Sequence, residues 1–124
     1  MKKLFTKYWG LIFVVILSFW SIKPILGPGF FPMHDNTQVA RVFEMGQALK
    51  DGMFPVRWVS DLGYGYGYPI FNFYGPLSYY AGGLINALGV DALNSTKAMM
   101  VIGILLSGIF MYLLAREFWG EGGA

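Results

Sequence analysis

The sequence has no cysteine, few charged residues and a single histidine. Without cysteine, no disulfide can brace a loop of this chain. Charged residues make up 13% of the sequence, whereas hydrophobic residues make up 56% and aromatic residues 19%. This composition is typical of a membrane protein. The net charge is only +2, and we expect no nucleic-acid partner.

Two long stretches are poor in charge. The stretch 8–26 has no charged residue before Lys23, and the stretch 98–115 has none at all. At about 1.5 Å per helical residue, each comes close to the roughly 30 Å thickness of the hydrocarbon core. We therefore predict transmembrane helices over 8–26 and 98–115, and an all-α membrane protein.

A cleaved signal peptide is the alternative interpretation of 8–26. No small-residue cleavage pattern follows this stretch, because the chain continues Gly-Pro-Gly-Phe-Phe-Pro over 27–32. That continuation favours an uncleaved span. A soluble enzyme with a signal anchor is disfavoured by the uncharged run 98–115.

Basic residues flank the two predicted spans. Three lysines lie within 1–7, and Arg116 follows the second span. Positive charge near the ends of spans favours the cytoplasmic side. We expect 1–7 and 116–124 to be cytoplasmic and 27–97 to form an extracytoplasmic loop, in a multi-pass protein of the bacterial inner membrane.

A further uncharged run, 70–90, is long enough to be counted as a third span, which would place the carboxyl end outside. Pro76, Asn72, Asn86 and several glycines within it oppose both insertion and a continuous helix. We predict an interfacial helix over about 76–88 instead.

A second interfacial helix is predicted over about 36–50. Asp35 is a suitable N-cap, Gln38 occupies the capping-box position, and Gly52 is placed to end the helix. Apolar residues recur at helical spacing and polar residues turn elsewhere, so the helix is expected to lie along the membrane surface. The apolar positions are Val39, Val42, Phe43 and Leu49, and the polar positions are Gln38, Arg41 and Glu44.

The carboxylate of Asp35 has two interpretations. In one it only caps the helix, and His34 is a polar neighbour. In the other it faces a membrane-embedded pocket as a base or as a ligand for a divalent cation such as Mg²⁺ or Mn²⁺, with His34 assisting it. Spacing alone favours the cap, and one residue can serve in both ways.

Glycine alternates with tyrosine along 63–68. Such a backbone turns sharply and can present the rings of Tyr64 and Tyr66 to a sugar or a lipid headgroup, while Arg57 could hold a phosphate. An irregular interfacial segment anchored by tyrosines is an equal alternative. A nucleotide-binding glycine loop is excluded, because no strand and helix flank the run in the required order.

Two helices and a loop cannot bury much of a core. We expect an amino-terminal fragment of a longer polytopic protein, whose remaining transmembrane helices would be its partners. A complete small membrane protein is the alternative.

The order of these features resembles the bacterial membrane proteins labelled "6-pyruvoyl-tetrahydropterin synthase-related", over nearly the whole chain from Tyr8 to Arg116. Their layout is in turn similar to the amino-terminal part of GT-C glycosyltransferases, which include protein mannosyltransferases and aminoarabinose transferases. The segments that carry the resemblance are Met33-His34-Asp35, Ala48-Leu49-Lys50-Asp51-Gly52, Phe54-Pro55-Val56-Arg57-Trp58, Gly63-Tyr64-Gly65-Tyr66-Gly67-Tyr68-Pro69, Phe71-Asn72-Phe73-Tyr74 and Pro76-Leu77-Ser78-Tyr79-Tyr80.

The resemblance implies a transferase that passes a sugar from a polyprenyl-phosphate carrier to an acceptor outside the membrane. Asp35 would then be the loop acid, as base or metal ligand, with His34 beside it. The candidates for the sugar and lipid-phosphate site are Arg57, Tyr64, Tyr66, Asn72 and Tyr74. A second acid, which many GT-C enzymes carry in a later loop, is not in this chain, so the segment alone is expected to be inactive.

The competing hypothesis is a non-catalytic membrane protein that binds lipid or lipid-linked saccharide, or that assists a transporter. Asp35→Asn separates the two hypotheses, because an enzyme would lose turnover and keep binding.

Overall fold

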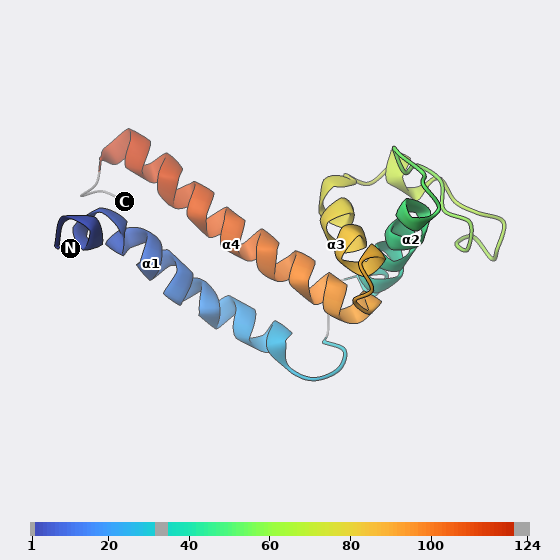
Figure 1. The fold of residues 1–124 in the computed structure, drawn as a ribbon, viewed down its shortest axis with the longest axis horizontal. Coiled ribbons are helices and arrows are strands. Elements are labelled where there is room, and N and C mark those ends of the chain that lie inside the picture. Colours follow the sequence, from blue (N-terminus) through green and yellow to red (C-terminus); the bar gives the residue numbers. More distant parts are fainter. Residues whose placement is uncertain (1, 32–34, 121–124) are drawn as a thin grey trace. The chain divides into compact units, whose positions relative to one another are not determined.

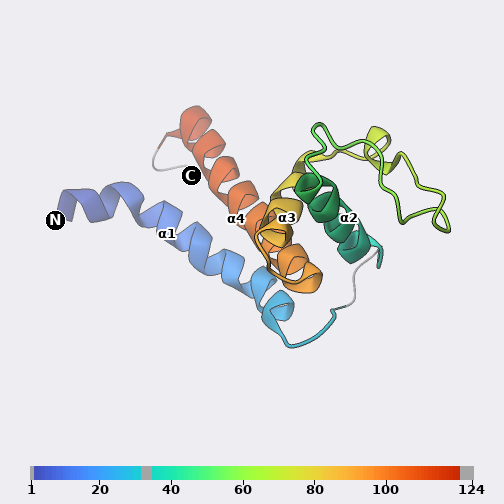
Figure 2. The ribbon, with the colours of Figure 1, turned by 45° about the vertical axis from the view of Figure 1, so that its right-hand side comes forward.

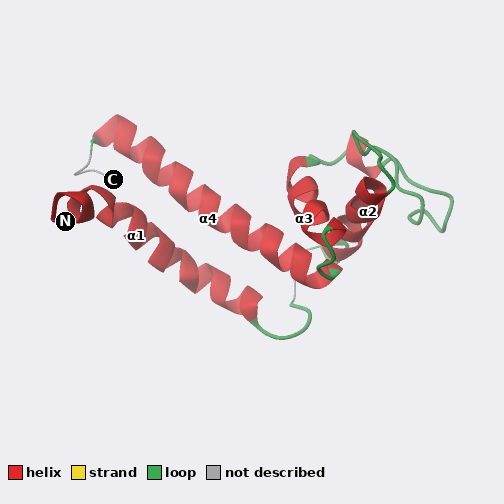
Figure 3. Ribbon diagram, viewed as in Figure 1, coloured by secondary structure: helices red, strands yellow, loops and turns green. Residues whose placement is uncertain are grey.

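A computed structural model describes residues 2–31 and 35–120, with the side chains of the first helix described from Trp9 onward. The described residues form helices and loops without a β-strand, so the predicted all-α class is confirmed (Figure 3). In chain order the helices are α1 (Lys2–Ile22), the short 3-10 helix η1 (Lys23–Leu26), α2 (Gln38–Lys50), the 3-10 helix η2 (Ile70–Asn72), α3 (Leu77–Ala87) and α4 (Ala92–Trp119) (Figure 1).

The chain divides into two compact units. The first unit holds α1, η1 and the part of α4 from Met100 onward. The second unit is residues 29–99, with α2, η2, α3 and the beginning of α4.

Two helical stretches in the described residues are long and apolar enough to cross a membrane, Trp9–Leu26 and Ala92–Trp119. Their bounds differ from the expected ones. The α-helix α1 already begins at Lys2 and gives way at Lys23 to a 3-10 turn, where Pro24 lacks an N–H to continue the ladder. Helix α4 is longer than 98–115 at both ends.

Within the first unit, α1 lies beside α4 (Figure 2). Two glycines make room for the contact: a Cβ on Gly10 would lie 2.6 Å from Cε2 of Tyr112, and one on Gly108 would lie 2.9 Å from Cγ1 of Val14. Small residues serve this purpose between apolar helices. Gly103, on the same helix as Gly108, has no described atom within 4 Å of its Cβ position.

The run 70–90 does not form one long helix. It begins with η2, continues through a turn and then forms α3, which has 11 residues. At about 1.5 Å per residue, α3 is only about half as long as the hydrocarbon core is thick.

Helix α2 ends as predicted at Gly52. This glycine has φ +79°, and its N–H donates to the carbonyl of Leu49 at 3.1 Å, while the N–H of Met53 donates to the carbonyl of Ala48 at 2.9 Å. These two bonds are those of a Schellman motif, which needs a left-handed residue after the helix.

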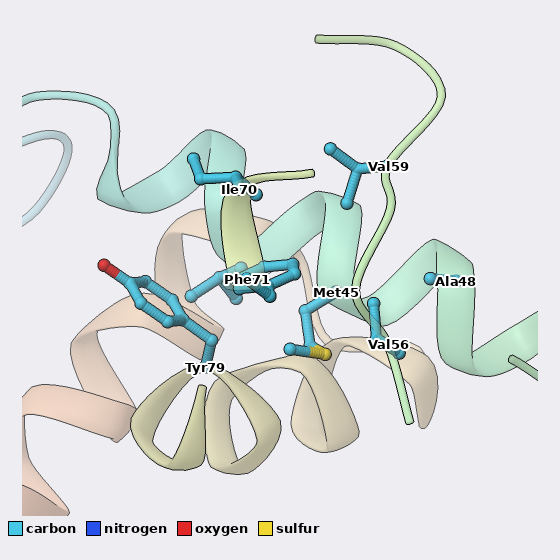
Figure 4. Packing of buried hydrophobic residues seen from close by; sticks show 8 residues of the cluster. Met45, Ala48, Val56, Val59, Ile70, Phe71 and Tyr79 are labelled. Carbon is cyan, nitrogen blue, oxygen red and sulfur yellow. The ribbon is translucent and has the colours of Figure 1, made fainter. Parts of the chain in front are cut away.

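The core of the second unit lies between α2 and α3 (Figure 4). Val42 and Met45 are fully buried on α2. The two helices approach closely at glycines, because a Cβ on Gly83 would overlap the side chain of Met45 and a Cβ on Gly46 would overlap Asn86.

The long connection from α2 to α3 completes this core. It buries four apolar side chains against the two helices, and its backbone at Val56 donates to the hydroxyl of Tyr80 at 2.7 Å. The four side chains are those of Val56, Val59, Ile70 and Phe71.

Candidate functional site

Asp35 lies just before α2, in a turn that its own side chain stabilises. The Oδ1 atom accepts from the hydroxyl of Thr37 at 2.7 Å and from the N–H of Thr37 at 3.2 Å. Helix α2 begins at Gln38 with Thr37 as its N-cap residue and without a side-chain cap bond. The predicted capping box is therefore wrong, because the N-cap position is held by Thr37, two residues after Asp35, and the side chain of Gln38 accepts from Tyr79 instead.

The other oxygen of Asp35 is held by Arg41. Oδ2 lies 2.9 Å from Nη2 of Arg41, whose side chain is 8% exposed, against 35% for Asp35. The guanidinium also stacks over the ring of Tyr74, with Cζ 4.2 Å from the ring centroid. A cation over an aromatic face gains electrostatic attraction that grows as water is excluded.

Tyr79 of α3 connects this ion pair to the start of α2. Its hydroxyl accepts from Nη1 of Arg41 at 3.2 Å and donates to Oε1 of Gln38 at 2.6 Å. Gln38 and Arg41 are three positions apart, so they share one face of the helix. We call these linked side chains, Asp35, Arg41, Tyr79 and Gln38, the Asp35 network. It joins the segment before α2 to α2 and α3.

Contacts within the network shift the pKa values of its two ionisable side chains, Asp35 and Arg41. Hydrogen bonds from the Thr37 hydroxyl and N–H lower the pKa of Asp35, and the charge of Arg41 lowers it further. Burial acts to lower the pKa of Arg41, but Tyr79, Asp35 and Tyr74 together outweigh burial and raise it. Both groups are therefore charged at neutral pH, and Asp35 in this arrangement is a weak base.

A pocket of about 290 Å³ opens beside the network. The wall is almost entirely apolar, and Thr37 and Arg41 line it with their carbon atoms. The lining residues are Thr37, Ala40, Arg41, Leu62, Gly63, Tyr68 and Ile70. The buried Nε of Arg41 has no hydrogen-bond partner among the described residues. The pocket itself suits a hydrocarbon, and an anionic group attached to that hydrocarbon would have to reach the guanidinium of Arg41 beside it.

The sequence predicts that α2 turns its polar residues away from its apolar face, and the structure buries two of these polar residues within the second unit. Arg41 and Glu44 are buried, and Glu44 is only 6% exposed, whereas Phe43 lies at the surface. The carboxylate of Glu44 accepts a backbone hydrogen bond from Asp61, and burial followed by the charge of Asp61 raises its pKa. The polar stripe of this helix thus faces the long loop and α3.

The structure separates the other predicted site residues into groups. Tyr74 belongs with Asp35 through Arg41. Arg57 and Asn72 form an exposed pair, with Nη1 3.3 Å from Oδ1. Tyr64 and Tyr66 are outside the pocket lining, and His34 lies outside the described residues.

Metal binding by Asp35 stays a prediction. In residues 2–31 and 35–120, no three His, Cys, Asp or Glu residues come together in a way that could hold a metal ion. Both oxygens of Asp35 have protein partners, so a cation would have to displace Arg41 or Thr37.

Three members of the site were missed by sequence reasoning. Arg41 was named only as a polar position of its helix, Tyr79 only within a segment that carries the family resemblance, and Thr37 not at all. The available signal was the spacing of Gln38 and Arg41 on one side of α2, but their partner Tyr79 lies 38 positions from Arg41.

Comparisons of this chain with protein-family models, with curated proteins and with solved structures find no match. Function must therefore be inferred from the site itself.

Proposed function

We propose that this chain is the amino-terminal portion of an integral protein of the bacterial inner membrane, with both of its ends on the cytoplasmic side. In this proposal it binds a polyprenyl-phosphate-linked sugar and takes part in moving the sugar to an acceptor outside the membrane, as GT-C enzymes do. The two long apolar helices support a membrane location. The layout of Asp35 before a short helix supports the enzyme class.

One observation carries the proposal: an apolar pocket lies beside the buried guanidinium of Arg41, whose ion-pair partner Asp35 is the more exposed of the two. A polyprenyl phosphate has two matching parts, a phosphate for Arg41 and an isoprenoid chain for the surface made by Leu62 and Ile70. Guanidinium groups bind phosphate with charge-assisted hydrogen bonds. Asp35, which is the more exposed partner of the ion pair, can be exchanged for that phosphate.

This exchange would prepare the proposed reaction. A phosphate on Arg41 would release Oδ2 of Asp35, and the loss of the guanidinium would remove one of the causes that lower the pKa of the carboxylate, after the larger effect of the hydrogen bonds from Thr37. Asp35 would then take the proton of the acceptor hydroxyl, whose oxygen bonds to the anomeric carbon. The bond from that carbon to the phosphate oxygen breaks, and the electron pair leaves with the polyprenyl phosphate, which Arg41 stabilises.

The test compares Asp35→Asn with wild type in membranes that contain the full-length gene product. Transfer of labelled sugar from a polyprenyl-phosphate donor is measured at matched expression, alongside binding of the same donor. Asn keeps the size and the acceptor oxygen but cannot take a proton, so we expect transfer to fall at least about a hundredfold while binding is retained. Asp51→Asn, at the exposed end of α2, is the matched control. Undiminished transfer in Asp35→Asn would overturn the catalytic part of the proposal.

A non-catalytic binding protein is the second candidate, and the low pKa of Asp35 favours it. In that case Asp35 only positions Arg41. Arg41→Met would abolish donor binding under either candidate, because the phosphate loses its cation. Asp35→Asn would change neither binding nor any downstream transfer if the protein only binds.

A further inference from the structure

The glycine-tyrosine segment forms a small hairpin with a fixed shape. Val59 and Tyr68 form an antiparallel bridge, with N···O distances of 3.1 and 2.8 Å. Beyond the bridge, the N–H of Gly67 donates to the carbonyl of Leu62 at 3.0 Å, and that of Tyr66 donates to Gly63 at 3.1 Å. Since Val59 is buried in the core, the base of the hairpin is anchored.

The packing around Trp58 holds the hairpin tip in place. A Cβ on Gly67 would lie 2.5 Å from the indole of Trp58, so this close contact requires glycine. The ring of Tyr68 lies next to that of Phe73, with centroids 6.5 Å apart. The hairpin is therefore braced from both sides, and the rings of Tyr64 and Tyr66 are left exposed.

The tip displays two tyrosines completely. Tyr64 is 102% exposed and Tyr66 is 88% exposed. Tyr64 has φ +60°, a left-handed conformation that is unfavourable for a residue with a Cβ. In water, two aromatic rings held away from the protein add nothing to the stability of the fold, and the strained backbone lowers it. It is the expected geometry for a surface that contacts something else.

The chemistry of the tip fits the headgroup region of a lipid bilayer. Residues 62–70 contain no charged side chain, so a nucleic acid or an acidic partner has nothing to pair with. A phenol offers an apolar ring and a polar hydroxyl, and Tyr and Trp gather at membrane interfaces for this reason. The segment 29–99 is joined at both ends to helices that are long enough to cross a membrane, so a bilayer is within reach of the chain.

We propose that the tip of the hairpin, residues 63–67, inserts into the headgroup layer of the membrane through Tyr64 and Tyr66. This inference rests on the membrane location in the proposed function, and it does not need the transferase activity. It gives the two tyrosines a role outside the pocket.

This chain has no cysteine, so a cysteine introduced into it takes a single label once any cysteine outside these residues has been replaced by serine. Tyr66→Cys is preferred to a change at the strained Tyr64. The full-length protein is labelled with an environment-sensitive fluorophore and reconstituted in vesicles of phosphatidylethanolamine and phosphatidylglycerol. Quenching by lipids with a nitroxide at the headgroup is compared with quenching by aqueous iodide, and Gln47→Cys on the exposed side of α2 serves as the control.

Insertion predicts that the headgroup nitroxide quenches the label at position 66 at least about twofold more than the label at position 47, and that iodide shows the reverse order. Equal quenching by iodide at the two positions would overturn insertion. Shielding from iodide without lipid quenching would also overturn it, and would indicate a protein or saccharide partner.

A label at Ile16→Cys, on the outward side of α1, separates the two proposals. If lipids quench this label but not the label at position 66, insertion of the hairpin fails alone. If lipids quench neither, membrane location fails and insertion fails with it.

Discussion

The two units of this chain differ in the exposure of their apolar side chains. In α1, Ile16 and Leu17 have more than half of their surface exposed. In the second unit, Val42 and Met45 have none exposed, and the charged residues Arg41 and Glu44 are buried with them. A row of outward apolar residues is anomalous in water but is the expected arrangement in lipid. The difference shows that hydrophobicity alone does not predict which side chains are buried within the protein.

The largest expected effect comes from removing a buried side chain in the second unit. Met45→Ala should lower the free energy of unfolding by about 2–5 kcal/mol, because it leaves a cavity between α2 and α3. Leu17→Ala in α1 should change it by no more than about 0.5 kcal/mol. Denaturant titration in detergent micelles, followed by near-ultraviolet circular dichroism, measures both. Similar losses would mean that the outward face of α1 is packed in the folded protein.

The second effect comes from closing the space between α2 and α3. Gly83→Ala adds a methyl group that overlaps the side chain of Met45, and we expect a loss of about 1–3 kcal/mol. The control is Gly75→Ala in the same unit, where no described atom lies near the added methyl. The thermal midpoint should fall for Gly83→Ala alone, and a fall of equal size in the control would show that glycine flexibility, not packing, is responsible.

A smaller effect is expected from the same change between α1 and α4. Gly108→Ala should destabilise the first unit by about 1 kcal/mol, because the added methyl would lie 2.9 Å from Cγ1 of Val14, a milder overlap than the one with Met45 at Gly83. Gly103→Ala on the same helix meets open space and is the matched control. Protease protection of the helices in detergent reports the difference. If Gly103→Ala is the more harmful change, α4 packs through the face that carries Gly103 and not through the face that carries Gly108.

Several features of the fold were accessible from the sequence because they depend on local physics. An uncharged run long enough to cross a bilayer shows the helix of 98–115 without any knowledge of its neighbours. The end of α2 at Gly52 follows from the need for a left-handed residue after the helix. The mixture of proline and glycine in 70–90 likewise correctly predicted that no long helix forms there.

The site was less accessible because it depends on distant parts of the chain. Helical periodicity separates the polar stripe of α2 from its apolar stripe, but it does not say which stripe meets α3. Arg41 is buried because Tyr74 and Tyr79 cover it, and both come from beyond the long loop. Asp35 was singled out from the sequence, whereas its partner Arg41 could be recognised only in three dimensions.

The smallest effect is a pH dependence confined to the second unit, where two carboxylates act in opposite directions. The raised pKa of Glu44 means that the folded state binds this proton more tightly than the unfolded state. Stability should therefore rise as the pH falls through the folded pKa of Glu44 toward its ordinary value of 4.5. The lowered pKa of Asp35 has the reverse effect, so stability should be lost as the pH falls below 3.8.

Two substitutions show which residue causes the rise in stability and which causes the loss. Glu44→Gln should raise stability at neutral pH and flatten the rise toward pH 4.5, because the amide keeps an acceptor for the N–H of Asp61 without the buried charge. Asp35→Asn should flatten only the loss at lower pH. Thermal midpoints of the two variants and the wild type, measured in detergent across this pH range, distinguish the two contributions. A rise that persists unchanged in Glu44→Gln would show that another group supplies it, and would remove the reason to regard the buried polar side of α2 as a strained part of the second unit.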